Sequence, residues 1–280
     1  MPNQMTLNPL VLVKFALWII VVIVATILLL RRKVTSKVRL AFLIGGVLVF
    51  GFVFGFLIPG GLNPNPVSSL RTLLATVLVK HQLVLPVTAM LVILLLIVWV
   101  SNKSICGWGC QLGLLQDLLH RAGLPKQCPE SIEGWKPPFW LSNSVRIVAF
   151  VALVAGLVAS GLDWIGLIDP FQLFSFNFTL GIVLFSAGVL IASLFIYRPW
   201  CRFLCPFGLL GWLVEQVSLF RPRINREACK ECQLCVKACP TNAMADFYAG
   251  KKIHADCFAC GACIEACPRE DALGWRMKPG

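Results

Sequence analysis

Cysteine is the residue type whose spacing in this chain could do chemistry, because thiolates bind metal ions and iron–sulfur clusters. The chain has 13 cysteines among 280 residues. Eight of them form two copies of the pattern C-x2-C-x2-C-x3-C-P: Cys229, Cys232, Cys235 and Cys239, then Cys257, Cys260, Cys263 and Cys267. This duplicated pattern is typical of bacterial ferredoxins that hold two [4Fe-4S] clusters and carry single electrons.

In such ferredoxins each cluster takes three cysteines from one copy and the last cysteine from the other copy. The first cluster is therefore predicted at Cys229, Cys232, Cys235 and Cys267, and the second at Cys257, Cys260, Cys263 and Cys239. Structural zinc is the main alternative, but a zinc ion takes four ligands in one tetrahedron and does not require a duplicated Cys-Pro ending. Disulfides are disfavoured because the segment is predicted below to lie in the reducing cytoplasm.

Four further cysteines form a second pair of motifs. Cys106 and Cys110 start CGWGCQLGLL, and Cys201 and Cys205 start CRFLCPFGLL, so both copies share C-x3-C-x2-G-L-L. Residues i and i+4 lie on one face of a helix, and we expect these four thiols to hold a further iron–sulfur cluster or a metal ion at the inner membrane face. The alternative is four free thiols packed as small apolar side chains. Cys128 has no partner at a metal-ligand spacing, and no role is assigned to it.

These motifs belong to an unusually apolar chain, in which 58% of residues are hydrophobic and 14% are charged. Soluble domains have about 25% charged residues, so a membrane is the predicted solvent for most of the chain. Five apolar runs are long enough to cross about 30 Å of hydrocarbon. They are Leu10–Leu30, Leu40–Ile58, Leu83–Val100, Ile147–Ile168 and Thr179–Tyr197.

The formal net charge of +12 is distributed by membrane side. With five spans, 22 of the 25 Lys and Arg fall on the side that carries residues 31–39, 101–146 and 198–280. The positive-inside rule makes that side cytoplasmic, which predicts a multi-pass inner-membrane protein with its N-terminus outside and its cysteine-rich end in the cytoplasm. A nucleic-acid partner is disfavoured, because the basic residues do not gather on one aromatic-rich motif.

The predicted fold is mainly α. It is a five-helix transmembrane bundle, made of an N-terminal helix and two helical-hairpin repeats, with a C-terminal α+β ferredoxin domain. The predicted segments are an N-terminal helix and basic loop (1–39), a first membrane repeat (40–115), a cytoplasmic connector (116–144), a second membrane repeat (145–220) and the two-cluster ferredoxin domain (221–280).

Two C-x3-C motifs after membrane spans, followed by two ferredoxin motifs, resemble the polytopic membrane ferredoxins of the NapH type, which are quinol dehydrogenase components of periplasmic nitrate reductase systems. They are also similar to the C-terminal halves of NosR-type proteins. The resemblance covers about residues 40–280, with two departures: Gln111 stands where proline is expected after the first C-x3-C, and the span Leu10–Leu30 is additional.

The resemblance implies an electron-transfer subunit that connects the menaquinone or quinone pool with a partner redox protein of a membrane respiratory complex. The alternative is an assembly or maturation factor that supplies metal or electrons to another membrane redox enzyme. No motif for independent substrate chemistry is visible in the sequence.

Quinone chemistry needs an apolar slot with groups that take up protons. Polar residues near the predicted outer face are the first candidates: Lys80, His81, Asp163, Asp169 and Gln172. His81 is the only histidine on that side and is the first candidate for a proton acceptor. The alternative is that Lys80 and His81 only mark the headgroup level at the start of the third span. A quinone site nearer the clusters, under Trp108, Trp200 and Arg202, is the alternative position.

Overall fold

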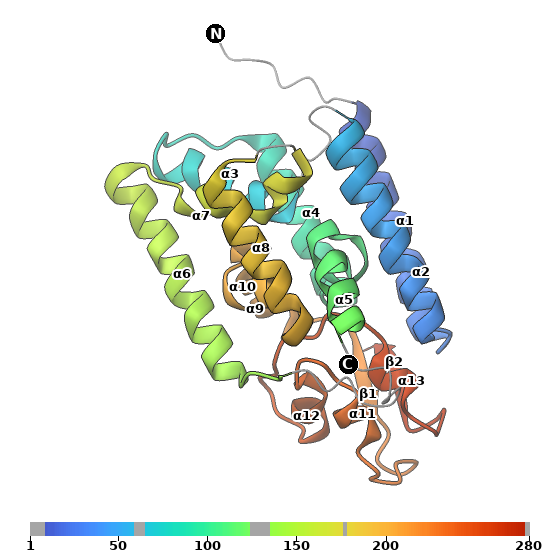
Figure 1. Ribbon diagram of the computed structural model, residues 1–280. Helices are drawn as coiled ribbons and strands as arrows, with labels where there is room; N and C mark the ends of the chain where they lie inside the picture. Colours follow the sequence, from blue (N-terminus) through green and yellow to red (C-terminus); the bar gives the residue numbers. More distant parts are fainter. Residues whose placement is uncertain (1–8, 59–64, 124–134, 176–177, 278–280) are drawn as a thin grey trace.

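The computed structural model describes residues 9–58, 65–123, 135–175 and 178–277, so Cys128 lies outside the described residues. Its membrane part is helical (Figure 1). In chain order the elements are α1 (Pro9–Leu30), α2 (Ser36–Gly46), η1 (Val47–Leu57), α3 (Pro66–Leu78), α4 (Leu85–Ser101), η2 (Ile105–Gly109), α5 (Gln111–Gly123), α6 (Phe139–Ser160), α7 (Trp164–Ile168), η3 (Pro170–Ser175), α8 (Leu180–Phe195), α9 (Pro199–Phe203) and α10 (Pro206–Glu215).

Among the described residues, three helices are long and apolar enough to cross a membrane: α1, the continuous α2–η1 helix, and α6. Large apolar side chains point outward from these helices and from α8, including Ile20, Phe52, Val148 and Leu184. Exposure of such apolar surfaces to water is unfavourable, whereas lipid chains solvate them. The predicted membrane location is therefore supported.

The five predicted spans are reproduced only in part, because two of them fall on shorter helices, α4 and α8. The predicted span Ile147–Ile168 is wrong at both ends. Helix α6 begins at Phe139 and ends at Ser160, where Gly161 adopts a left-handed φ of 69° and closes the helix. Asp163 then caps the separate helix α7 through the N–H of Gly166. The error arose because α7 is itself apolar and extended the hydrophobic run past the cap.

Two short segments turn back into the bundle. Ser101 at the end of α4 lies beside Thr26, with 2.7 Å between their hydroxyl oxygens. Eight residues later, the carbonyl oxygen of Gly109 accepts a hydrogen bond of 3.0 Å from the indole of Trp18. In α1, Trp18 lies about two helical turns before Thr26. The segment from Ser101 through η2 to Gly109 therefore runs back alongside α1. Helix α5 then returns towards the start of α2.

The second repeat has the same form. After α8, the chain turns back through α9, where the backbone N–H of Trp200 donates to Oε1 of Gln116 on α5 at 3.0 Å. Helix α10 then runs back to the ferredoxin domain. Both C-x3-C motifs therefore lie in re-entrant hairpins, and each hairpin packs against the other repeat.

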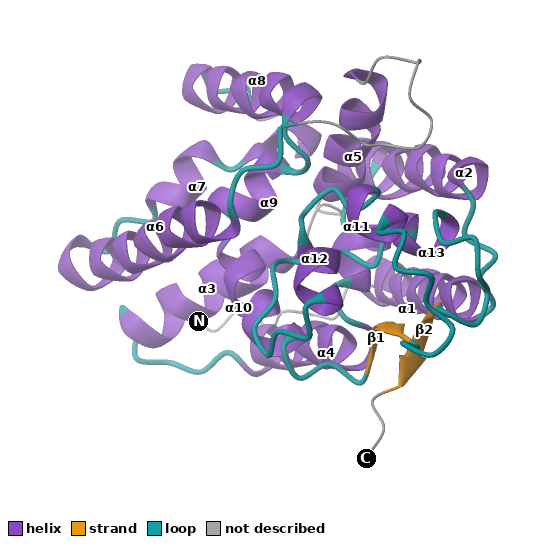
Figure 2. Ribbon diagram, turned by 90° about the horizontal axis from the view of Figure 1, so that it is seen from below, coloured by secondary structure: helices purple, strands orange, loops and turns teal. Residues whose placement is uncertain are grey.

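The ferredoxin domain is small and lies at the lower end of the bundle in Figure 1, and Figure 2 views the molecule from that end. Strand β1 (Phe220–Ile224) pairs antiparallel with β2 (Leu273–Met277). The short helices α11 (Leu234–Lys237), α12 (Ala243–Tyr248) and α13 (Ala262–Glu265) complete it. It is tied to the bundle by the indole of Trp108, which donates to the carbonyl oxygen of Ala259 at 2.9 Å, and by contacts of α1 with β2.

Candidate functional site

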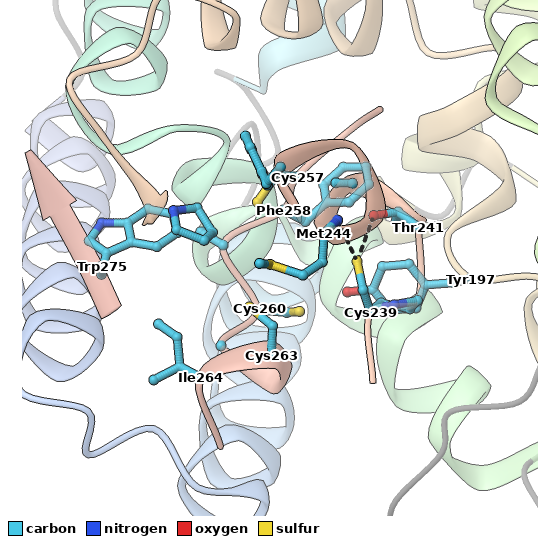
Figure 3. Close-up of a pocket in the computed structure, with 16 residues that line it drawn as sticks. Tyr197, Cys239, Thr241, Met244, Cys257, Phe258, Cys260, Cys263, Ile264 and Trp275 are labelled. Carbon is cyan, nitrogen blue, oxygen red and sulfur yellow. Dashed lines mark hydrogen bonds between the residues drawn. The ribbon is translucent and has the colours of Figure 1, made fainter. Parts of the chain in front are cut away.

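Two cavities in the ferredoxin domain are each lined by four cysteines. The first is lined by Cys239, Cys257, Cys260 and Cys263, and Figure 3 shows these side chains around one space. The second is lined by Cys229, Cys232, Cys235 and Cys267. The structure thus brings together three cysteines of one motif copy and the last cysteine of the other in each cavity. We name them the inner and the outer cavity, respectively.

The backbone between the cysteines explains how three thiols of one copy can converge. In the second copy Ala259 and Gly261 have left-handed φ values of 51° and 82°, and in the first copy Glu231 and Gln233 both have φ of 56°. Alternating left- and right-handed residues turn successive backbone N–H groups towards one side and form an anion-binding concavity. Both loops are therefore suited to hold a negatively charged group.

The two cavities differ in exposure. The inner cavity is lined by Tyr197, a residue of the membrane part, and by Phe258, both of which are buried. In the outer cavity Cys232 is exposed and Cys229 and Cys267 are partly exposed. Burial raises the pKa of the Cys235 thiol to about 11, so this thiol is neutral at pH 7 until a bound metal displaces its proton.

The cysteines of the two C-x3-C motifs are all buried and share one apolar cluster. Cysteines of the two motifs lie close enough to interact electrostatically. Cys201 interacts with Cys110, and Cys205 interacts with Cys106 and Cys201. The structure therefore brings the two motifs together from opposite repeats. Among the residues that the structure describes, no three Cys, His, Asp or Glu side chains converge closely enough to hold a single metal ion.

The cysteines of one motif do not share a continuous helix, which corrects the expected i, i+4 geometry. Cys110 and Cys205 are extended, with ψ of 113° and 115°, and each precedes the first residue of a new helix. Proline at position 206 disfavours a helical conformation for the residue before it. Gln111 occupies the equivalent first position of α5, so the first motif takes the same form without proline.

The glycine shared by the two motifs has a steric role. A Cβ at Gly113 would lie 2.7 Å from the carbonyl oxygen of Cys106, and a Cβ at Gly208 would lie 2.5 Å from that of Cys201. The N–H of Gly208 donates to Sγ of Cys205 at 3.3 Å. Each hairpin can therefore close tightly, and the second cysteine of the motif sits at a helix N-terminus, which stabilises negative charge on sulfur.

A buried carboxylate, Asp117 on α5, joins the two repeats. It accepts hydrogen bonds from Arg39 at 2.8 Å, Arg198 at 3.0 Å, Arg121 at 3.0 Å and the Tyr197 hydroxyl at 3.0 Å. Burial alone would raise the pKa of Asp117, but the three guanidinium groups hold that pKa well below its usual range. Asp117 is therefore ionised at neutral pH.

A second buried carboxylate, Asp256, joins the ferredoxin domain to the bundle. It accepts a hydrogen bond from Arg146 at 3.0 Å and another from Lys103, whose ammonium nitrogen also lies 3.6 Å from Glu215. Burial opposes ionisation, yet Arg146 and Lys103 hold the pKa of Asp256 below its usual range. Asp256 directly precedes Cys257, so this ion pair positions the loop that lines the inner cavity.

The two networks are related by the repeat. Lys103 and Arg198 each stand three residues before the first cysteine of a C-x3-C motif. Arg198, from the second repeat, binds Asp117 of the first, and Lys103, from the first repeat, lies beside Glu215 of the second. Lys103 and Arg198 were not among the predicted site residues, although their equal offset from the two motifs is detectable in the sequence.

Positive charge exceeds negative charge around the four C-x3-C thiols. Among the described residues that are buried in this region, six are cationic and three are anionic. They are Lys14, Arg39, Lys103, Arg146, Arg198 and Arg202 against Asp117, Glu215 and Asp256. Several buried guanidinium nitrogens of Arg39, Arg198 and Arg202 also have no hydrogen-bond partner in the described part of the chain. Such a region favours an anionic group.

At the opposite end of the bundle, Arg71 donates hydrogen bonds to both Asp163 and Asp169. Nε of Arg71 lies 3.0 Å from Oδ1 of Asp163, and Nη1 lies 2.8 Å from Oδ2 of Asp169. Burial, opposed by Arg71, raises the pKa of Asp169 to about 6. Gln172 donates to the carbonyl oxygen of Gly166 nearby.

Lys80 and His81 are exposed in the turn between α3 and α4. The structure thus groups three of the five predicted quinone residues near a cation, Arg71, which was not among the predicted residues. It leaves Lys80 and His81 on the surface.

The chain matches two known sequence families. The 4Fe-4S dicluster domain matches residues 221–268, and the 4Fe-4S binding domain matches twice, at residues 83–127 and 178–227. The double match covers both C-x3-C motifs and supports the internal repeat. No solved structure matches the chain.

Several curated proteins are similar in sequence. YccM of Escherichia coli is 30% identical over 67% of this chain and 56% of its own length. The regulatory protein NosR of Pseudomonas aeruginosa is 26% identical over 53% of this chain and 21% of its own length. The ferredoxin-type protein NapH of Haemophilus influenzae is 28% identical over 53% of this chain and 51% of its own length.

The chain spans about half or less of the length of these relatives. The similarity nevertheless includes the membrane repeats and the ferredoxin motifs, and the predicted family is confirmed. The chain is a homologue of the NapH-type membrane ferredoxins.

Proposed function

We propose that this protein exchanges electrons between the membrane quinone pool and a partner redox protein through three iron–sulfur sites. The observation that carries the proposal is that four buried thiols from the two repeats share one apolar cluster with Phe258, which lines the inner ferredoxin cavity. When bound, iron–sulfur clusters supply one-electron transfer at potentials set by charge, hydrogen bonds and exposure. The chain's own residues align the three sites and set their surroundings.

The first two sites are the ferredoxin cavities, with one [4Fe-4S] cluster on Cys229, Cys232, Cys235 and Cys267 and one on Cys257, Cys260, Cys263 and Cys239. Left-handed loop residues turn backbone N–H groups towards each cavity. All eight cysteines that line the two cavities lie inside the match to the dicluster domain. The donor set of four thiols and inward N–H groups fits a cluster that carries net negative charge.

The third site is formed by Cys106, Cys110, Cys201 and Cys205. Four sulfurs around a zinc ion at about 2.3 Å must lie within about 4 Å of one another, and the described side chains do not converge so closely. The surplus of buried cations around the four thiols offers charge compensation to an anionic iron–sulfur cluster. The match of the 4Fe-4S binding domain to both hairpins adds support.

The three sites follow one another through packed side chains. Phe258, which follows Cys257 of the inner cavity, belongs to the same apolar cluster as Cys106 and Cys201. The outer cavity ends at the exposed Cys232. Electrons could therefore pass from the bundle to the protein surface without crossing water, and the surface near Cys232 is the place where we expect a partner redox subunit to dock.

The proposed orientation keeps the N-terminus outside and the ferredoxin domain in the cytoplasm. Most Lys and Arg residues lie towards the ferredoxin end, as the positive-inside rule requires. Each hydroquinone that is oxidised gives two electrons and two protons, so two successive one-electron transfers are needed per molecule. Reduction of the purified protein by a menaquinol analogue within seconds would support this function, whereas no reduction would contradict it.

Replacing all four C-x3-C cysteines with serine tests the third site. Iron content is expected to fall from about twelve to about eight atoms per chain, because the two ferredoxin clusters keep their ligands. Iron and acid-labile sulfide analysis of the purified protein measures the change. A wild-type content of about eight atoms that survives the quadruple substitution would rule the third cluster out.

A matched pair of single substitutions tests the cluster assignment. Cys267→Ser is expected to disturb the outer cluster, and Cys239→Ser the inner cluster, although each residue lies in the other motif copy. Electron paramagnetic resonance of the reduced protein should show the loss of a different signal in each variant. Loss of the same signal in both, or disturbance of the cluster held by the residue's own copy, would contradict the assignment.

A further inference from the structure

The outer face of the two-stranded sheet carries opposed positive charges. Successive residues of a strand point to opposite faces, and the paired residues Pro222 and Trp275 point inward, where they line the inner cavity and are buried. The neighbouring pair, Arg221 and Arg276, therefore lies on the outer face, with the two arginines directly opposite each other. Like charges in such a pair destabilise a sheet unless another group neutralises them.

Further cations extend this pair into a basic groove. Five cationic residues line the groove: Arg221, Arg223, Arg226, Lys251 and Arg276. No Asp or Glu is among the described residues that line it. Burial and the nearby charge of Arg221 both lower the pKa of the Arg223 guanidinium, so the two arginines lie close enough to repel each other.

The chain itself neutralises little of this charge. Lys251 is paired with Asp246, whereas the four arginines form no ion pair with a carboxylate in the described part of the chain. Their printed acceptors are neutral carbonyl oxygens, that of Tyr248 for Arg226 and that of Asp271 for Arg276. An anion from outside the chain would therefore find guanidinium groups without a competing carboxylate.

The sheet lies where the apolar surface of the bundle ends. Trp99, in the last turn of α4, is exposed, and its carbonyl oxygen accepts a hydrogen bond of 2.8 Å from the N–H of Leu219, two residues before Arg221. At the other end of the sheet, Arg32 after α1 donates to the carbonyl oxygen of Leu273. The sheet thus lies beside the ends of α1 and α4 (Figure 2). Exposed tryptophan and basic residues at helix ends are typical of the headgroup layer of a membrane.

Apolar side chains are exposed at the end of the sheet nearest to Trp99. Val217 precedes β1, and Met277 ends β2, and both are exposed. A phospholipid matches this combination, because its acyl chains can cover apolar side chains while its phosphate accepts paired hydrogen bonds from guanidinium groups. Free phosphate would satisfy the arginines and leave the apolar side chains in water.

We propose that this groove binds the headgroup of an anionic phospholipid, from the leaflet on the ferredoxin side, with Arg221 and Arg276 as the principal phosphate ligands. The inference does not depend on the proposed electron exchange, because it involves no cluster and no quinone. The bound lipid neutralises the opposed arginines and holds the sheet, whose inner face lines the inner cavity, against the membrane surface. Phosphatidylcholine binds more weakly, because its ammonium group offsets the phosphate.

Native mass spectrometry of the purified protein in detergent, titrated with phosphatidylglycerol or with phosphatidylcholine, tests the site. Wild type is expected to bind phosphatidylglycerol at least about tenfold more tightly than phosphatidylcholine. The double variant Arg221→Gln/Arg276→Gln should lose about ten- to thirtyfold in affinity for phosphatidylglycerol. Because it removes two like charges that face each other, it should leave the sheet stable, and unchanged ferredoxin cluster spectra will show that the domain is intact.

A matched control removes two charges near the same membrane face. Lys33→Gln/Lys37→Gln changes exposed residues between α1 and the first turn of α2, neither of which lines the groove. This variant should bind phosphatidylglycerol like wild type. An equal loss of affinity in both double variants would reduce the effect to general attraction between basic residues and anionic lipid, and would overturn the site.

Photolabelling supplies the second measurement, with phosphatidylglycerol that carries a photoreactive group on its headgroup. Label in residues 220–226 or 273–277 supports the groove, whereas label confined to other segments would overturn it. Equal affinity of wild type for the two lipids would also overturn it, and would leave an acidic protein surface as the occupant that the charge of the groove fits.

Discussion

Replacing Asp117 with asparagine is expected to destabilise the folded protein by about 3–5 kcal/mol, because a buried ion network would lose its only carboxylate. Arg39 and Arg198 are fully buried and both bind Asp117 at 3.0 Å or less. Without the carboxylate, their charges would remain in the bundle without compensation. Unfolding in detergent, followed by circular dichroism against increasing sodium dodecyl sulfate, measures the change.

Lys251→Met is the matched control, because it removes an ion pair with Asp246 in which the lysine is 63% exposed. Solvent screens such pairs, and we expect no measurable change in stability. Equal stability of Asp117→Asn and wild type would show that the network does not stabilise the fold.

The pH dependence of stability follows from the same carboxylate. The folded-state pKa of Asp117 lies well below its usual value, so its contribution is fully present above the unfolded value of about 3.9 and is lost as the pH falls towards the folded value. The stability difference between wild type and Asp117→Asn should therefore be constant from pH 5 to 7 and shrink below about pH 4. A difference that grows on acidification would contradict this account.

Substitution of Gly107 by alanine is the second change with a large expected effect. A Cβ at this position would overlap the backbone carbonyl oxygen of Phe258, which cannot move aside as a flexible side chain would. The hairpin around η2 and the loop that lines the inner cavity would have to separate. We expect a loss of about 1–3 kcal/mol or more, with faster proteolytic release of the ferredoxin domain.

Gly45→Ala is the control for this change, since a Cβ at Gly45 in α2 meets no atom within 4 Å. It should leave the domain contact intact, because alanine is favoured over glycine inside a helix. The rate of limited proteolysis in detergent distinguishes the two variants. A Gly107→Ala protein that resists the protease as well as wild type would show that the two surfaces do not touch.

Much of the chemistry could be predicted from cysteine spacing, because short loops leave few ways to bring thiols together. The eight ferredoxin cysteines were divided into two groups on this basis, and the structure lines one cavity with each group. The repeat was also visible, because the shared glycines Gly113 and Gly208 meet the same steric demand in both hairpins.

Other features depend on contacts that the sequence does not reveal locally. Arg39 and Arg198 lie 78 and 81 residues from Asp117 in the chain, so no local pattern connects them. The end of α6 depends on the left-handed turn at Gly161, which a hydropathy profile cannot detect. The re-entrant path of η2 and α9 was not predicted for a similar reason. In a hydropathy profile, a short apolar segment cannot be distinguished from the end of a membrane span.

The exchange of cations between the repeats has a consequence for the order of biosynthesis. Lys103 and Arg146 are made early, but the carboxylate they share, Asp256, is translated near the end of the chain. The charges of Lys103 and Arg146 therefore meet Asp256 only after the C-terminal domain has emerged and docked, whereas Arg198 already meets Asp117 within the membrane part.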